Sequence, residues 1–208
     1  MVLAAPLNRW LLQPGVQVAL GILGLLPALW LVWAAATDQL GANPAQALIR
    51  QTGDMALRML CITLAITPLR HMLGLSALVR YRRTLGLTMC FYALAHATCY
   101  AWFDMGWDLP DIAADIAKRP FILVGFLAWL LLLPMAATSL NLAVRAMGVA
   151  RWQMLHRSVY AVALLSILHF FWMRSAKNDF ADVAIYGGLL ALLLGWRVWR
   201  WQKNRLKN

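Results

Sequence analysis

Six long apolar segments, separated by short polar ones, set the pattern of this chain. Each is close to the ~20 residues that an α-helix needs to cross a bilayer. They comprise residues 16–36, 55–73, 84–103, 120–138, 152–172 and 183–199. Because the segments and their short connections use nearly all 208 residues, the pattern predicts a single domain, residues 1–208. It is an all-α integral membrane protein, a bundle of six transmembrane helices.

The second segment is less uniformly apolar than the others. Arg58 and Pro68 lie inside it, and Arg70 lies near its end. A charged residue within a span is costly and usually has a partner. Two interpretations of Arg58 stay open: an outward-turned side chain with Asp54 as a helical ion-pair partner, or a side chain that faces the bundle and binds a haem propionate. We keep this segment as a span because omitting it would break the alternation of charge along the chain.

Basic and acidic residues alternate between the two sides of the predicted bundle. Thirteen of the nineteen basic residues fall on one side: Arg9, Arg70, Arg80, Arg82, Arg83, Arg145, Arg151, Arg157, Arg197, Arg200, Lys203, Arg205 and Lys207. All eight acidic residues fall in the three connections on the other side: Asp38, Asp54, Asp104, Asp108, Asp111, Asp115, Asp179 and Asp182. Basic residues concentrate on the cytoplasmic side of membrane proteins, so the pattern predicts that both termini are cytoplasmic.

Composition agrees with a membrane protein and argues against two other classes. A hydrophobic content of 62% and a mean hydropathy of +0.66 exclude an ordinary soluble domain. The net charge of +11 comes in short groups between apolar segments, which is typical of loops facing anionic lipid rather than of a nucleic-acid-binding face. The three cysteines lie in apolar segments without C-x-x-C spacing, which favours packing roles.

The candidate chemistry lies with the histidines, because three of the four fall inside predicted spans. His96 follows Arg83 by thirteen residues and His169 follows Arg157 by twelve, on helices that both run from inside to outside. At 1.5 Å per residue, the two imidazoles lie within ~1.5 Å of each other in depth. Such a pair suits the two axial positions of a haem. The alternative is that each histidine hydrogen-bonds a neighbouring helix or lines a polar cavity.

The other polar candidates lie toward the cytoplasmic side. On an ideal helix His156 points ~140° away from His169 and lies ~20 Å from it, so the two do not bind the same iron. His156 is either a ligand for a second haem, a flavin or a quinone, or an interfacial residue. Arg82 and Arg83 lie at matching depth, as solvated basic residues or as partners of haem propionates or a flavin phosphate. His71 is expected at the surface.

Five stretches of the chain carry a resemblance to a known family. They are GLLPALWLVWA, TGDMALRMLCITLAITPLR, RRTLGLTMCFYALAHATCY, KRPFILVGFLAWLLLLPMAATS and RWQMLHRSVYAVALLSILHFFW. In this order, they resemble the MsrQ family, the haem-binding membrane subunits of bacterial periplasmic methionine-sulfoxide reductase systems. That family lies within the ferric-reductase-like transmembrane superfamily.

The resemblance implies a cytochrome of the bacterial inner membrane that binds haem b, with one haem or two. Electrons would come from the quinone pool or a cytosolic flavin reductase. They would pass to a periplasmic molybdopterin reductase subunit, which carries the catalytic site and repairs oxidised methionines. The family histidines map onto His96, His156 and His169, and the family is also described as binding FMN. The superfamily usually has two histidines on each of the third and fifth helices, but the residue fourteen before His96 is Arg82.

Two other functions stay open from the residues alone. A small proton or solute transporter could use His96, His169 and Arg58 as a polar relay. A membrane scaffold could dock a partner through its loops without using the histidines. No nicotinamide-binding or phosphate-binding glycine motif is present, so we expect any flavin reductase domain on another polypeptide. The acidic segment 104–115 is predicted to face the periplasmic partner.

Overall fold

The computed structural model describes residues 4–175 and 178–206, and all of the regular secondary structure there is helical. This confirms the predicted all-α class. The helices are α1 (Ala4–Leu11), α2 (Pro14–Ala36), α3 (Pro44–Leu73), η1 (Ser76–Arg80), α4 (Tyr81–Cys99), η2 (Tyr100–Asp104), α5 (Leu109–Lys118), α6 (Pro120–Ala137), α7 (Asn141–Met147), α8 (Val149–His156), α9 (Val159–Ser175) and α10 (Ala181–Arg205). Lys207, which belongs to the predicted basic side, lies outside the described residues.

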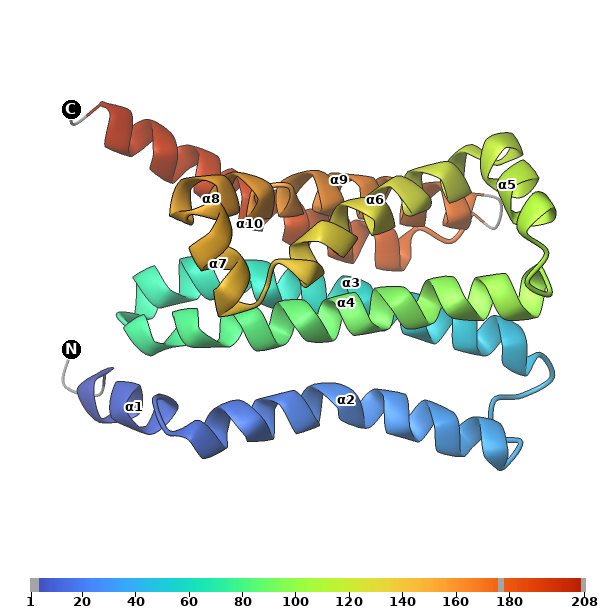
Figure 1. Cartoon of the computed structure of the whole chain (residues 1–208), viewed down its shortest axis with the longest axis horizontal. Helices are drawn as coiled ribbons and strands as arrows, with labels where there is room; N and C mark the ends of the chain where they lie inside the picture. Colours follow the sequence, from blue (N-terminus) through green and yellow to red (C-terminus); the bar gives the residue numbers. More distant parts are fainter. Residues whose placement is uncertain (1–3, 176–177, 207–208) are drawn as a thin grey trace.

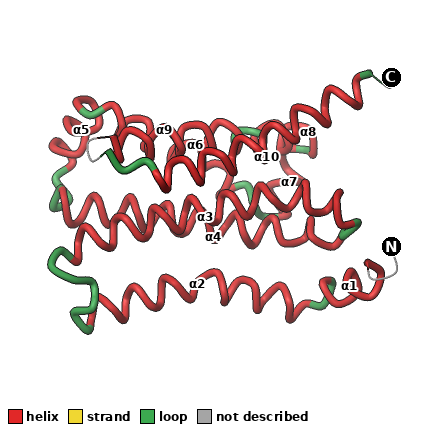
Figure 2. The backbone as a smooth tube through the Cα atoms, turned by 180° about the vertical axis from the view of Figure 1, so that it is seen from behind, coloured by secondary structure: helices red, strands yellow, loops and turns green. Residues whose placement is uncertain are grey.

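The long helices run along one common axis and alternate in direction (Figure 1). Helix α2 forms an outer layer, the α3 and α4 pair lies in the middle, and α6, α9 and α10 form the opposite layer. Both ends of the chain lie at the same end of the bundle as α7 and α8, and α5 covers the other end (Figure 2). This arrangement agrees with termini on one side of a membrane.

Five of the predicted spans correspond to helical stretches long and apolar enough to cross a membrane: α2, α3, α6, α10, and α8 with α9. The third predicted span corresponds to α4, whose residues are more polar. Helix α4 contacts α2, α3 and α6, so side chains such as Thr88 and Tyr92 are buried against protein. Its lower hydropathy reflects its central position. The full count of six spans stays a prediction.

Helix α3 begins well before the predicted start of the second span at residue 55. Asn43 caps it, its side chain accepting a hydrogen bond of 3.0 Å from the Gln46 N–H, and Pro44 occupies the first turn. Asp54 therefore lies within α3, and its placement in an outer connection was wrong. An asparagine followed by proline is a sequence signal for the start of a helix. The apolar pattern alone misses this start, because residues 44–54 are mostly polar.

The fifth predicted span is two helices joined by a tight turn. Helix α8 ends at His156 and α9 begins at Val159. The Ser158 hydroxyl donates to the Leu155 carbonyl at 2.6 Å, and the Tyr160 N–H bonds the Arg157 carbonyl at 3.1 Å. These i to i+3 bonds tighten the backbone between the two histidines of this segment. The stretch Val149–Ser175 is long and apolar enough to cross a membrane as one unit, and it departs from the ideal helix assumed for His156 and His169 at residues 157–158.

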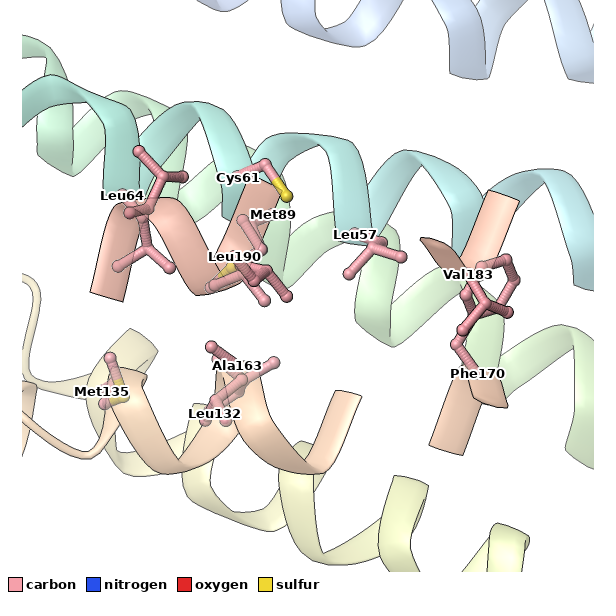
Figure 3. Packing of buried hydrophobic residues seen from close by; sticks show 13 residues of the cluster. Leu57, Cys61, Leu64, Met89, Leu132, Met135, Ala163, Phe170, Val183 and Leu190 are labelled. Atoms are coloured by element: carbon pink, nitrogen blue, oxygen red, sulfur yellow. The ribbon is translucent and has the colours of Figure 1, made fainter. Parts of the chain in front are cut away.

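A hydrophobic cluster joins the middle layer, α3 and α4, to the layer of α6, α9 and α10 (Figure 3). Its side chains come from α3, α4, α6, α9 and α10: Leu57, Leu60, Cys61, Leu64, Met89, Leu132, Met135, Val162, Ala163, Phe170, Val183, Leu190 and Leu193. Dispersion contacts among these residues hold the helices against one another, since lipid provides little hydrophobic driving force between helices. The cluster fixes the relative positions of the four helices that surround the candidate site.

Helix α2 is attached to α4 through a hydroxyl that bonds two groups of the α2 backbone. The Tyr92 hydroxyl donates to the Gly24 carbonyl at 2.8 Å and accepts from the Ala28 N–H at 3.1 Å. These two groups are four residues apart, the spacing of an α-helical hydrogen bond. Tyr92 is fully buried, so its hydroxyl finds both hydrogen-bond partners on α2, away from water.

Pro68 leaves one backbone carbonyl of α3 without its usual partner. Proline has no N–H, so the Leu64 carbonyl, four residues earlier, lacks its i+4 donor. The Arg197 guanidinium of α10 donates to that carbonyl at 2.5 Å and to the Leu193 carbonyl at 2.8 Å. Its side chain therefore connects α3 and α10 near the basic end of the bundle.

Candidate functional site

A cavity of about 800 Å³ lies among α3, α4, α6 and α9. This volume is within the ~300–1,000 Å³ typical of small-molecule sites. Leu57, Met89 and Val162 contribute to its largely apolar wall. Its polar lining residues come mainly from the end of the bundle where the aspartates gather: Asn43, Gln46, Arg50, Asp54, Asp104 and Arg119. The cavity is therefore apolar inside and polar at one rim.

His96 of α4 and His169 of α9 both line this cavity, and they approach each other across it. Their ring centroids are 6.1 Å apart, with an angle of 75° between the ring planes. Two imidazoles that coordinate one metal ion from opposite sides, each nitrogen ~2 Å from it, have centroids ~6 Å apart. The observed separation therefore has the right size for axial coordination of a single iron.

The hydrogen bonds of the two rings decide which nitrogen faces the cavity as a ligand. His96 Nδ1 lies 2.8 Å from the Ile49 carbonyl oxygen, and His169 Nδ1 lies 2.6 Å from the Phe121 carbonyl oxygen. A carbonyl only accepts, so each Nδ1 carries the proton and donates. In a neutral imidazole, Nε2 then keeps a free lone pair. Metal-binding histidines commonly have this arrangement, with the second nitrogen donating to a backbone carbonyl.

The other histidine predicted for the site lies apart from this cavity. His156 stacks on Trp152 with a centroid distance of 4.1 Å, and its Nε2 lies 3.2 Å from the Thr138 hydroxyl. It does not contribute to the cavity wall around His96 and His169. Its role as a ligand for a second group stays a prediction.

Arg82 and Arg83 also lie away from the cavity, at the basic end of the bundle. Arg82 donates to the Thr67 hydroxyl, which also accepts from Arg197 at 3.3 Å. Arg83 donates to the Asn141 side chain at 3.1 Å. The structure joins these two arginines to neighbouring helices, and their role toward a cofactor stays a prediction.

Two arginine side chains other than Arg82 and Arg83 line the cavity. Arg50 and Arg119 contribute to its polar rim, and sequence reasoning missed both because each stands in a segment expected to be an exposed connection. Arg58, considered as a cofactor partner, instead donates to the Tyr186 hydroxyl of α10 at 2.9 Å. The two arginines at the rim are the ones placed to bind carboxylates of a molecule in the cavity.

The acidic segment 104–115 is partly helical and unequally exposed. Asp108 caps α5 by accepting from the Asp111 N–H at 3.0 Å, and both side chains lie on the surface. Asp115 pairs with Arg119 at 2.8 Å and accepts from the Tyr100 hydroxyl at 2.7 Å, and its side chain is only 12% exposed. Asp115 therefore stabilises this end of the bundle, which leaves Asp108 and Asp111 as the accessible acidic residues at the start of α5.

Comparison with known proteins gives one family of membrane proteins and several close relatives. Residues 52–167 match the family described as ferric reductase like transmembrane component. A relative from Polaromonas naphthalenivorans (strain CJ2) is 58% identical over 199 residues, covering 95% of this chain and 91% of its own. Relatives from Ralstonia nicotianae and Herminiimonas arsenicoxydans are 50% and 48% identical, covering 88% and 93% of this chain and 85% and 89% of their own. All three are named protein-methionine-sulfoxide reductase heme-binding subunit MsrQ. No solved structure matches the chain.

Proposed function

The chain belongs to the ferric-reductase-like transmembrane family, and from this membership we propose that it is a haem-binding subunit that passes electrons across the membrane to a methionine-sulfoxide reductase. The observation that carries the proposal is the pair of opposed imidazoles, whose centroids are 6.1 Å apart. In each ring Nδ1 donates to a backbone carbonyl, which leaves the unprotonated Nε2 as the available ligand. The names of the relatives support haem as the bound group.

The residues present fit a haem of b type in the cavity. A bound haem would supply a one-electron carrier, and His96 and His169 would hold its iron. The Ile49 and Phe121 carbonyls hold the two Nδ1 protons and fix the orientation of the rings. The apolar wall limits access of water, and Arg50 and Arg119 at the rim are placed to neutralise the propionates.

The sidedness of the charges gives the proposed orientation of the chain in the membrane, and the proposed direction of electron transfer is set on it. In this proposal, both termini and the basic end are cytoplasmic in the bacterial inner membrane. Electrons enter there, from a quinone or a cytosolic flavin reductase, and His156 with Arg82 and Arg83 marks the place where FMN or a second haem would bind. They leave at the end covered by α5, where a periplasmic molybdopterin reductase of the MsrP type would accept them.

The test is the visible spectrum of the detergent-purified protein, oxidised and then reduced with dithionite. We expect a low-spin b-type spectrum in the wild type. We also expect it in His71→Ala, a control that removes a histidine at the basic end of α3, near Trp196. One haem per chain is the expected ratio, and a ratio of two would assign the second to His156. A folded but colourless protein would contradict the proposal and favour a polar relay for transport.

Charge removal on α5 tests the proposed partner surface. The double variant Asp108→Asn and Asp111→Asn is expected to slow reduction of the partner by ~3–10-fold at low salt and to weaken the salt dependence of the rate, because rim charges act mainly on association. Asparagine at position 108 keeps the helix cap. Stopped-flow reduction of the partner by the pre-reduced haem protein gives the rate.

A matched control for the α5 variant removes an acidic charge elsewhere at the same end. Asp38 follows α2 and has a positive φ of 54°, which asparagine tolerates well. Asp38→Asn is therefore expected to keep the wild-type rate and salt dependence. Unchanged kinetics in the α5 variant would show that the partner docks elsewhere.

A further inference from the structure

Each of the two cavity histidines lies against a glycine of the neighbouring helix. His96 of α4 lies on Gly53 of α3, and His169 of α9 lies on Gly125 of α6. In both cases the carbonyl that accepts the Nδ1 proton belongs to the residue four positions before the glycine, Ile49 or Phe121. The same arrangement of histidine, glycine and carbonyl thus occurs twice, once on each side of the cavity.

The spacing of four residues has a geometric reason. In an α-helix every Cα–Cβ bond tilts toward the N-terminus, so a side chain at position i+4 covers the backbone of the preceding turn, which includes carbonyl i. Carbonyl i already accepts from the N–H of residue i+4, and it can take a second donor only from the side. A glycine at i+4 leaves that side open.

The distances show how little room a side chain would have. A Cβ on Gly53 would lie 3.0 Å from His96 Nδ1 and 3.1 Å from its Cε1. A Cβ on Gly125 would lie 2.8 and 2.9 Å from the same atoms of His169, and 3.2 Å from its Cγ. Carbon and nitrogen atoms at these separations repel each other, so the imidazole would have to move, and farther at Gly125 than at Gly53.

We propose that Gly53 and Gly125 are positioning residues for the two imidazoles: the missing side chains let each ring reach its carbonyl, which turns both Nε2 atoms toward one axis. The inference rests on the proposed function, because the group that both Nε2 atoms would bind is a haem iron. The two Nδ1 bonds also set the ring planes at 75°.

The test uses alanine at each glycine and reads the coordination state. Gly125→Ala is expected to lose most of the low-spin ferric signal and to bind carbon monoxide when reduced, because a displaced imidazole leaves one axial position open. Gly53→Ala is expected to show the same change to a smaller extent. Ferric EPR and the carbon monoxide difference spectrum are recorded alongside haem content and size-exclusion profile.

Three other glycines provide controls. Gly86 on α4 and Gly188 on α10 have open space where a Cβ would stand, so alanine there is expected to leave both readouts unchanged. A Cβ on Gly24 would lie 3.1 Å from Cγ2 of Thr88. Gly24→Ala therefore crowds a helix contact without touching a histidine, and it is expected to keep the low-spin signal. Loss of that signal in Gly24→Ala would mean that crowding anywhere in the bundle has this effect, and it would overturn the proposal.

One measurement needs no variant. When two axial imidazole planes are nearly perpendicular, two iron d orbitals become nearly equal in energy, and the ferric EPR signal becomes strongly anisotropic. We expect that signal in the wild type, and a rhombic signal of parallel imidazoles would overturn the proposed ring positions even if Gly125→Ala did not fold. Absence of any low-spin haem in the wild type would instead overturn the proposed function. A low-spin haem in the wild type, together with unchanged EPR and carbon monoxide spectra in Gly53→Ala and Gly125→Ala, would overturn only the positioning role of the two glycines.

Discussion

Replacing His96 or His169 with alanine is expected to abolish the low-spin haem spectrum and electron transfer to the partner. The two rings lie across the cavity with centroids 6.1 Å apart, and the Nδ1 of each is bonded to a carbonyl, so Nε2 is the nitrogen left to act as a ligand. Loss of a partner that merely orients a metal-bound histidine costs ~10–100-fold in affinity or activity. Loss of the ligand itself is expected to cost more.

Three measurements on purified His96→Ala and His169→Ala check this expectation. They are the reduced-minus-oxidised spectrum, the haem content, and the rate of partner reduction. Free imidazole added to either variant is expected to restore part of the low-spin signal, because it fits the space that the side chain leaves. Helical circular dichroism shows whether the bundle remains folded. A wild-type spectrum in both folded variants would place the haem ligands elsewhere in the chain.

The second large effect is expected at the carbonyl that Pro68 leaves open. Arg197→Met removes the donor to the Leu64 carbonyl, at 2.5 Å in the wild type, and an unsatisfied buried acceptor costs about 1–3 kcal/mol. Pro68→Ala restores a backbone N–H that can bond the same carbonyl. The cost of Arg197→Met is therefore expected to be about 1 kcal/mol smaller in the Pro68→Ala background.

Unfolding of the four proteins of this double-mutant cycle, followed by circular dichroism in mixed detergent, gives the coupling. Arg200→Met is the matched control on α10, because the Arg200 guanidinium lies over the Trp196 ring at 5.3 Å and no hydrogen bond joins it to a backbone carbonyl in residues 4–175 and 178–206. A cost of Arg197→Met that is equal in both backgrounds would show that its interactions with Leu193 and Tyr160 dominate.

The sequence predicts the long helices and the main residues of the candidate site for physical reasons. Bilayer thickness fixes the length of each apolar segment, and basic residues fix its direction. Depth then follows from the rise per residue, which is why His96 and His169 could be paired before their separation was known. Helix boundaries were less certain where polar residues continue a helix, as they do at the start of α3.

Partners that depend on rotation about a helix axis could not be predicted. Gly53 and Gly125 are two of thirteen glycines, and nothing in their local sequence distinguishes them from Gly86 or Gly188. The proximity of Arg119 to the cavity depends on how α5 folds over the end of the bundle, which Asp115 and Tyr100 help to fix. Such relations come from packing between helices and leave no periodic signal in a single sequence.

The hydroxyl of Tyr92 inside α2 has a consequence for the order of assembly. Helix α2 is synthesised before α4, and until Tyr92 is present the Gly24 carbonyl and the Ala28 N–H have only each other as helical partners. Tyr92 is synthesised 64 residues after Ala28, so α2 can form its two bonds to the Tyr92 hydroxyl only after α4 has been made. The attachment of α2 to the bundle through this hydroxyl therefore depends on a helix made later in synthesis.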